Sequence, residues 1–366
     1  MLVAGVRCWV LGVRAVQHRP HPCHTWTNTQ HQSPRTLSSN SLTRKLLVTG
    51  GAGFIGSHMC EYFLERGWSV EIIDDFSTGK RENMPAGITL HAVDVRTPEA
   101  SRIVAQGQFD TIVHLAAQMD VRKSVADPVF DASVNIVGTL NLIEALRGTP
   151  RAKDCRFIFA STGGVLYGDF VTPPNKESYP KDPESPYAIS KLSVEYYLAY
   201  YDRVHGMDTV GLRYGNVFGP RQDPHGEAGV VAIFCGRILD GKPLTVFGDG
   251  EQTRDYVYVR DVAAATFLAA TRPLPRRERL DTRGFNVGTG IGTSVNYLAR
   301  TLLDAAGTAV QIEYAPPRAG EQQHSFLDAS KAREVLGWVP ETSLTDGLSQ
   351  SFKWFEARHR TGTVKA

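Results

Sequence analysis

A short apolar run that ends in closely spaced glycines limits most strictly what this chain can fold into. Residues 46–48 precede Gly50, Gly51, Gly53 and Gly56, which fit both G-x-G-x-x-G and G-x-x-G-x-x-G. Such glycines permit a tight turn from a strand into a helix, and they let backbone N–H groups approach a pyrophosphate. The run is either a dinucleotide site or a glycine-rich turn without a nucleotide. The flanking strand and helix favour the dinucleotide, with contacts from Gly50, Gly53, Phe54, Ile55 and Gly56.

Downstream of these glycines, β-rich runs alternate with helical patterns. Ile55, Met59, Tyr62 and Phe63 share one helix face, and Gly67 follows where a C-terminal cap belongs. The alternation predicts an α/β fold with a doubly wound parallel sheet, in which ligands bind at the carboxyl ends of the strands. Glycine and proline become dense from about residue 220, which predicts a smaller C-terminal substrate-binding lobe. The expected strands are residues 46–48, 69–73, 111–115, 156–159 and 209–213.

The first 44 residues differ in composition from the rest. They are rich in Arg, Ser, Thr, His and Gln, and no acidic residue precedes Glu61. The segment is either an organellar transit peptide, which would place the protein in a mitochondrion or another organelle, or a disordered extension or early start of a cytoplasmic protein. Arg7 and Arg14 interrupt its apolar stretch, so we expect no stable membrane insertion.

These patterns predict the domain organisation. We expect a leader or disordered extension at 1–44, a dinucleotide-binding domain at 45–215, a mainly substrate-binding lobe at 216–355 with segments that return to the sheet, and a tail at 356–366. With 40 basic and 38 acidic residues, the chain has no excess of one charge that would indicate a nucleic acid as partner. Its five cysteines lack metal-binding spacing, and we expect reduced thiols.

Acidic residues at the ends of strands indicate which dinucleotide would bind. Asp74 and Asp75 follow the second expected strand, where a carboxylate can bond the adenine ribose hydroxyls and would repel a 2′-phosphate. NAD is therefore favoured over NADP. Asp94 and Val95 are candidates for the adenine edge, although Asp94 could equally be a turn residue.

A second cofactor contact is expected after the third apolar run. Leu115, Ala116 and Ala117 lie where the backbone must pass close to the cofactor, and the alanines leave room for it. We expect the preceding His114 to be buried for structural reasons.

Residues 185–191 contain a pair suited to proton transfer. Ser185 fits an N-cap and Pro186 the first helical turn, so Tyr187 and Lys191 would share one helix face. At this spacing the ammonium, assisted by an oxidised nicotinamide, favours a phenolate that can accept a proton from a substrate. Ser161 and Thr162, at the end of the fourth expected strand, either assist with a hydroxyl or cap the local backbone.

Three stretches together resemble the extended short-chain dehydrogenase/reductase family. They are TGGAGFIG at 49–56, SPYAISK at 185–191 and RDY at 254–256, and the resemblance covers about residues 45–355. Within the family, LRYGNVFGPRQ at 212–222 and FGDG at 247–250 are most similar to UDP-glucose 4-epimerases, and GWVP at 337–340 is similar to the C-terminal signature of the family. The resemblance implies a Rossmann-like sheet, NAD as cofactor and a UDP-sugar as substrate.

It also implies a reaction, the epimerisation of UDP-glucose or UDP-galactose at carbon 4. Tyr187 would take the proton of the 4-hydroxyl while carbon 4 is oxidised by NAD, and the 4-keto sugar would turn and be reduced on its other face. Thr162 matches the hydroxyl that assists Tyr187, Lys191 also orients the nicotinamide ribose, and Tyr214 would lie beside the nicotinamide. Related dehydratases and decarboxylases carry an acid after this threonine. Here Gly163 and Gly164 follow, which favours simple epimerisation.

The resemblance assigns the substrate side as well. Arg254 and Arg318 match the arginines that bind the diphosphate, a role suited to the paired donors of a guanidinium. Asn216 matches an asparagine that contacts the diphosphate, Glu321 would face the uridine ribose, and Val231 lies in the segment expected near the base. Judged without the resemblance, both arginines could equally be surface residues, with Arg254 paired to a nearby aspartate.

Some features leave alternatives open. Met119 stands where many 4-epimerases have a lysine near the cofactor phosphates, so NAD is either held less tightly or bound by Arg122 or Lys123. Gly215 replaces an aromatic residue of some members, which would widen the sugar pocket.

The substrate and the assembly also remain open. The sugar could instead be UDP-glucuronate or a UDP-N-acetylhexosamine, and the protein could be a related dehydratase or decarboxylase, or a non-catalytic NAD-binding sensor. Family members usually form homodimers through four helices, and the helix that begins at Tyr187 would contribute to such an interface.

Overall fold

The computed structural model describes residues 43–224, 229–318 and 322–361, and residues 43–366 cluster as one compact unit. The predicted leader lies outside the described residues except for its last two positions. Its role, and with it the choice between the cytoplasm and an organelle, therefore stays a prediction. Cys60, Cys155 and Cys235 are buried and form no disulfide among the described residues, and the reduced state stays a prediction.

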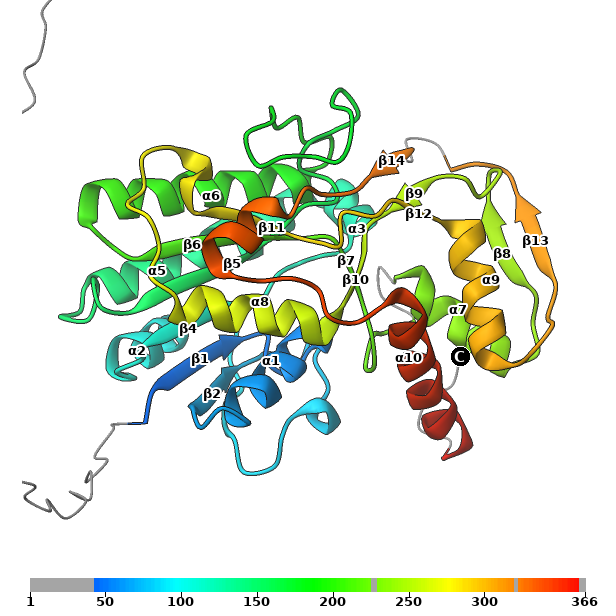
Figure 1. Ribbon diagram of the computed structural model, residues 1–366. Helices are drawn as coiled ribbons and strands as arrows, with labels where there is room; N and C mark the ends of the chain where they lie inside the picture. Colours follow the sequence, from blue (N-terminus) through cyan, green and yellow to red (C-terminus); the bar gives the residue numbers. More distant parts are fainter. Residues whose placement is uncertain (1–42, 225–228, 319–321, 362–366) are drawn as a thin grey trace, which may run out of the picture. The chain divides into compact units, whose positions relative to one another are not determined.

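A parallel sheet of seven strands forms the centre of this unit (Figure 1). Its order is β11-β6-β5-β4-β1-β2-β3, so the chain winds outward in both directions from the neighbours β1 and β4. All neighbouring pairs are parallel, which confirms the doubly wound α/β fold. The carboxyl ends of β1 and β4 flank the point where the winding direction reverses, which is where such sheets bind ligands. The strands are β1 (Lys45–Thr49), β2 (Ser69–Ile73), β3 (Thr89–His91), β4 (Thr111–His114), β5 (Arg156–Thr162), β6 (Thr209–Tyr214) and β11 (Gly284–Val287).

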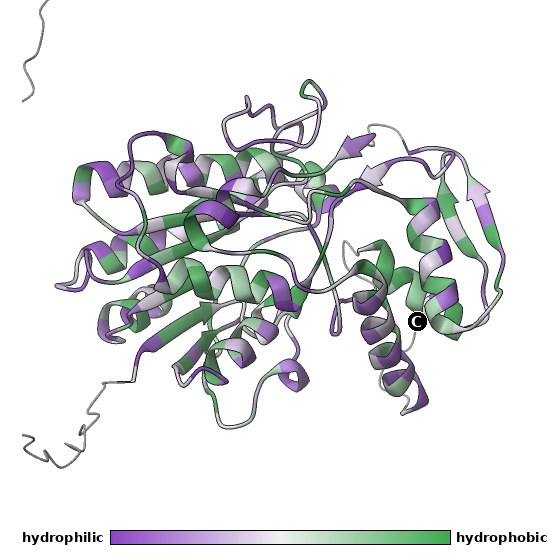
Figure 2. Ribbon diagram, in the orientation of Figure 1, coloured by the Kyte–Doolittle hydropathy of each residue, from purple (hydrophilic) through white to green (hydrophobic). Residues whose placement is uncertain are grey.

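Alternate residues of the strands face two separate layers of helices, because successive side chains of a strand point to opposite faces. Leu46 packs with Met59 and Phe63 on one face, whereas Leu47 packs with Leu142 on the other. Both faces are therefore apolar, and Figure 2 shows the strands coloured mainly hydrophobic. The first layer contains α1 (Phe54–Leu64) and α8 (Val259–Thr271), and the second contains α2 (Pro98–Gln106), α5 (Gly138–Arg147) and α6 (Pro186–His205).

The helix that follows the glycine turn ends as the sequence predicts. Gly67 has a φ of +77°, its N–H donates to the carbonyl of Leu64, and the N–H of Trp68 donates to the carbonyl of Phe63. This is a Schellman motif, and the Phe63 and Trp68 rings make the apolar contact that accompanies it, with centroids 5.1 Å apart.

The start of α6 also follows its local signals. The Ser185 hydroxyl accepts the N–H of Ala188 at 3.2 Å, and Pro186 is the first helical residue. A cap at this position sets the rotation of the helix, and therefore the direction in which Tyr187 and Lys191 point.

Residues 128–147 form one helical stretch with a π-helical turn inside it. It consists of α4 (Pro128–Ala132), η2 (Ser133–Val137) and α5, preceded by α3 (Val121–Ala126). By length and composition Pro128–Arg147 could cross a membrane, with a mean hydropathy of 1.3. Its buried side instead packs against α2 and α6 within the protein.

The C-terminal lobe has its own core, and Figure 1 shows it beyond the carboxyl ends of the sheet strands. Here α10 continues past residue 355, where a tail was expected, because Phe355 is buried in this core. The lobe contains α7 (Val230–Leu239), α9 (Val295–Ala306), α10 (Leu344–Arg360) and the parallel pair β8 (Leu244–Phe247) and β13 (Ile312–Ala315).

Short elements connect the lobe to the sheet. They are β7 (Asn216–Phe218) with β10 (Tyr256–Tyr258), and β9 (Thr253–Arg254) between β12 (Thr293–Ser294) and β14 (His324–Ser325). The remaining turns are η1 (Arg81–Asn83), η3 (Leu280–Arg283) and η4 (Ala332–Leu336).

Candidate active site

The glycine turn between β1 and α1 leaves no room for side chains where a ligand's phosphates would approach the backbone. Gly50 has a φ of +71°, and a Cβ there would lie 2.8 Å from the backbone nitrogen of Ala116. A Cβ at Gly56 would lie 2.1 Å from the carbonyl oxygen of Gly50. Gly53 precedes α1 without a side-chain cap, so the N–H groups of the first turn have no side-chain acceptor. This arrangement fits a pyrophosphate at the helix N-terminus.

Asp74 supports the glycine turn directly. Its carboxylate is buried and accepts the N–H groups of Ala52 and Phe76, each at 2.9 Å. Burial raises the pKa of this carboxyl. The exposed Asp75 accepts the N–H and the hydroxyl of Ser77. Both carboxylates therefore organise the loop after β2, and a contact of either with an adenine ribose stays a prediction.

The predicted adenine residues have other partners. Asp94 forms a two-pronged ion pair with the Nε and Nη2 of Arg96, whose hydrogen bonds hold the pKa of that carboxyl below its usual range. Asp94 also accepts the backbone N–H of Arg96, as a turn residue would. The Val95 side chain is buried in the core beneath α5, so only its backbone can face a cofactor.

His114 joins the ends of β1 and β4. Its Nδ1 lies 2.6 Å from the hydroxyl of Thr49 and its Nε2 lies 2.9 Å from the hydroxyl of Thr139. Burial lowers its pKa to about 3, so the ring is neutral at physiological pH. The expected structural role of His114 agrees with these contacts. Thr49 also accepts the N–H of Ala116, which fixes residues 115–117 against the glycine turn.

The predicted catalytic pair lies on α6 beside the end of β5. Lys191 is 3 % exposed, and its Nζ donates to the carbonyl of Ala160 at 2.9 Å. The same Nζ lies 5.8 Å from the ring centroid of Tyr187. Burial lowers the pKa of Lys191 to about 8. Thr162 is the last residue of β5, two positions beyond Ala160. A contact between its hydroxyl and the pair stays a prediction.

Sequence reasoning missed a buried polar group beneath this pair. Asp131 is 1 % exposed, and its Oδ2 accepts from the amide of Asn135, which also donates to the hydroxyl of Ser190. The charge of Asp131 raises the pKa of Lys191, against the effect of burial. Asn135 lies in the π-helical turn, a distortion that is frequent at functional sites. The available signal was a polar Asn and an Asp on the otherwise apolar face of a helix.

A buried ion pair behind β5 was also missed. Arg213 is fully buried and pairs with Glu195 of α6, whose carboxylate accepts the hydroxyl of Ser161. The available signal was an arginine within an apolar strand, because such a residue needs a buried partner.

Of the two glycines after Thr162, only Gly163 is tightly packed. A Cβ at Gly163 would lie 2.4 Å from the Leu327 side chain, and one at Gly164 would lie 3.6 Å from Oδ1 of Asn216. The carbonyl of Gly164 accepts the Ser325 hydroxyl at 2.8 Å. An acidic side chain at position 163 would therefore need rearrangement of the lobe segment that covers it.

Tyr214, the last residue of β6, is held by contacts with α8. Its ring is 5 % exposed in the core on the α8 face, and its hydroxyl is 2.9 Å from that of Thr266. A contact between Tyr214 and a nicotinamide stays a prediction.

The lobe brings some of the predicted substrate residues toward this edge. Asn216 begins β7, and its N–H donates to the carbonyl of Asp255. Arg254 on β9 donates to the carbonyl of Thr253. The carboxylate of the neighbouring Asp255 is buried and accepts the backbone N–H groups of Thr289 and Leu327. The guanidinium of Arg318 stacks on Phe247, 3.9 Å from the ring centroid. Glu321 lies outside the described residues.

Two expectations need correction. Val231 is fully buried in the core of the lobe, because its face of α7 packs against α9 and α10, and it cannot contact a base as placed. Gly215 does not widen a pocket, because a Cβ there would lie 2.9 Å from the carbonyl oxygen of Asp255. Met119 is 52 % exposed and Arg122 pairs with Asp120, so a phosphate contact by Arg122 or Lys123 stays a prediction.

Comparisons with known proteins agree with this geometry. The family model for GDP-mannose 4,6-dehydratase matches residues 47–351. UDP-glucose 4-epimerase from Mycolicibacterium smegmatis is 42% identical over 85% of this chain and 98% of its own length. The crystal structure of UDP-glucose 4-epimerase from Thermotoga maritima with UDP-glucose has a TM-score of 0.80 and 44% identity, covering 86% of this chain and 99% of that one. The enzyme from Thermus thermophilus in complex with NAD has a TM-score of 0.78 and 44% identity, covering 85% and 98%.

Proposed function

This chain belongs to the family of NAD-dependent nucleotide-sugar epimerases and dehydratases, and on that premise we propose that it interconverts UDP-glucose and UDP-galactose at carbon 4. The observation that carries the proposal is the hydrogen bond from Lys191, which lies beside Tyr187 on α6, to the carbonyl of Ala160, two positions before Thr162 at the end of β5. Gly163 and Gly164 supply no second acid there, and the tight packing at Gly163 leaves no space for one at that position. A single acid–base group is sufficient for epimerisation.

The residues present fit NAD. The backbone of Gly50, Gly53 and Gly56 with the start of α1 would hold the pyrophosphate, and Asp74 or Asp75 would bind the adenine ribose. Bound NAD supplies the reversible oxidation of carbon 4. A carboxylate beside the ribose disfavours the 2′-phosphate of NADP.

The side chains at the edge divide the proton transfer between them. Tyr187 takes the proton of the sugar 4-hydroxyl and returns it after the sugar has turned. Lys191 stabilises the phenolate by its charge and is oriented by its bond to Ala160. Thr162 donates to the oxygen that loses and regains the proton.

The lobe supplies the cationic groups for the nucleotide. Arg254 and Arg318 bind the diphosphate, and the stacking of Arg318 on Phe247 orders a long side chain before the ligand arrives. Asn216 would contact the diphosphate, and its amide oxygen lies near Gly164, where an added Cβ would be 3.6 Å away.

The test is direct conversion. Purified protein supplied with NAD should convert UDP-galactose to UDP-glucose, followed by chromatography, and a lack of conversion would contradict the proposal. Tyr187→Phe should lower kcat by about 10²- to 10⁴-fold while NAD still binds. A parallel panel of UDP-glucuronate and UDP-N-acetylhexosamines decides whether another sugar is preferred.

We also propose that the protein acts as a homodimer. The outer faces of α4, η2 and α6 expose apolar side chains that a solvated surface would not favour. They lie on neighbouring helices, since α4 contacts α6. The exposed residues are Val129, Phe130, Val137, Ile189, Tyr196, Tyr197, Tyr200 and Val204.

A further inference from the structure

The carboxylate of Glu195 connects the two elements that carry the catalytic groups. Glu195 lies on α6, one helical turn beyond Lys191 and two beyond Tyr187, and it is 3 % exposed. The hydroxyl of Ser161 donates to its Oε1 at 2.5 Å. Ser161 immediately precedes Thr162 on β5. One side chain therefore joins the helix of the proton acceptor to the strand of the assisting hydroxyl.

Arg213 fixes the orientation of this carboxylate from the neighbouring strand. Its Nε lies 3.0 Å from Oε1 of Glu195 and its Nη2 lies 2.6 Å from Oε2. The remaining donors bind Tyr167, at 3.0 Å, Asp281, at 2.6 Å, and the carbonyl of Glu177, at 3.2 Å. A planar guanidinium held on both edges cannot rotate without breaking several bonds.

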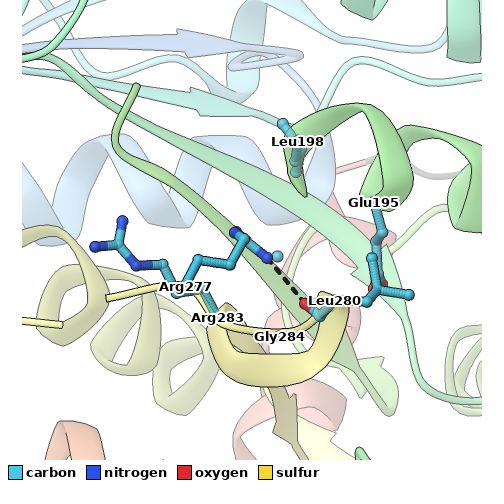
Figure 3. Close-up of a pocket in the computed structure, with 7 residues that line it drawn as sticks. Glu195, Leu198, Arg277, Leu280, Arg283 and Gly284 are labelled. Atoms are coloured by element: carbon cyan, nitrogen blue, oxygen red, sulfur yellow. Dashed lines mark hydrogen bonds between the residues drawn. The ribbon is translucent and has the colours of Figure 1, made fainter. Parts of the chain in front are cut away.

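Two glycines border this ion pair, and only Gly284 leaves too little room for a side chain. A Cβ at Gly211 would be 3.7 Å from the Glu195 side chain, and one at Gly284 would be 3.3 Å from Nη2 of Arg213. Figure 3 shows Glu195 and Gly284 lining a pocket together with Arg277 and Arg283. In that pocket Arg277 donates to the carbonyl of Leu280, at 2.8 Å.

Stability alone is a weak reason for such a pair. Removing two charges from water has a large desolvation penalty, and apolar replacements of buried ion pairs are often as stable or more stable. A buried polar group whose hydrogen bonds are all formed instead fixes one arrangement of the side chains around it. Catalytic groups need that selection, because displacements of about 0.5 Å already reduce their effect.

We propose that Ser161, Glu195 and Arg213 form a positioning unit that holds Thr162 at its working distance from Tyr187 and Lys191. The proposal rests on the proposed epimerase function. The three residues are 4 %, 3 % and 0 % exposed, so they act through Thr162 and α6 and not by contact with the sugar.

Ser161→Ala is the mildest test, because Glu195 keeps its pair with Arg213. We expect kcat for UDP-galactose to fall about tenfold, which corresponds to about 1.4 kcal/mol, while KM and the NAD dissociation constant change by less than about twofold. Thr209→Val is the matched control. It removes an equally buried hydroxyl that joins β6 to α6 at Leu198, away from the catalytic edge. It should lower the melting temperature similarly and leave kcat unchanged.

A double-mutant cycle separates positioning from general damage. If Ser161 acts through Thr162, Ser161→Ala should lower kcat in the wild-type background and have little further effect in a Thr162→Ala background. Equal losses in both backgrounds, or a loss in Ser161→Ala no larger than in Thr209→Val, would overturn the proposal. An inactive wild-type protein would instead contradict the epimerase function, so the two failures can be distinguished.

Discussion

Lys191 illustrates how one residue depends on its surroundings. Its ammonium is buried beneath Tyr187 with one backbone acceptor, Ala160, and burial moves its pKa down to about 8. Asp131, which lies on α4, opposes that shift because its charge raises the pKa of Lys191. The neutral His114 contributes no charge, and the charge of Glu195 is paired with that of Arg213. The lysine is thus protonated at neutral pH by a narrow margin.

This margin predicts the pH dependence of turnover. Because the charged form of Lys191 is lost as pH rises through about 8, kcat should decline above that pH. Asp131→Asn removes the charge that raises this pKa, so the decline should begin at lower pH. Asp127→Asn is the matched control, because Asp127 is exposed at the N-cap of the same helix and an asparagine can still cap it. An unchanged profile in Asp131→Asn would contradict the assignment.

At the scale of elements, the turn between β1 and α1 contains glycines that differ in how much room they leave for a side chain. Gly56 cannot carry a side chain, because its Cβ would lie 2.1 Å from the Gly50 carbonyl oxygen. Gly53 has an ordinary φ of −76°, and its Cβ would meet the same oxygen only at 3.2 Å.

Substitution of these glycines should therefore have unequal effects. Gly56→Ala should reduce NAD affinity at least about tenfold and destabilise the fold by about 1–3 kcal/mol, because the helix must move off the turn. Gly53→Ala should retain most of both properties. Calorimetric NAD titration and thermal unfolding measure both variants. Equal losses of NAD affinity and stability in the two variants would contradict the prediction that the close approach at Gly56 causes the difference.

For the whole molecule, the exposed apolar side of α4, η2 and α6 is the proposed dimer interface. Tyr196→Glu should weaken the proposed dimer by about 2 kcal/mol or more, because a charge would be buried at the interface. Ile291→Glu is the matched control, since Ile291 is 64 % exposed and Tyr196 59 %, but Ile291 follows β11, outside these helices. Sedimentation should give a monomer for the first variant only. A monomeric wild-type protein would contradict the dimer.

Much of the fold could be predicted because its signals are local. The glycine turn, the cap at Gly67, the start of α6 at Ser185 and the pairing of Tyr187 with Lys191 depend on residues within a few positions of one another. Alternation of strands and helices then restricts the topology, since parallel strands need crossover helices.

Other features depended on contacts between distant segments. The contacts among Ser161, Glu195 and Arg213 form only when β5, α6 and β6 are packed together. Asp131 affects the pKa of Lys191, sixty positions later, only because the fold brings the two residues close. The burial of Val231, which the family resemblance placed near the base, likewise depends on α7 packing against α9 and α10. The sequence by itself thus determined the chemical groups and the elements that carry them. The tertiary structure decided which groups are buried, and so which charges and hydroxyls surround the reacting proton, because burial depends on packing between residues that the chain keeps far apart.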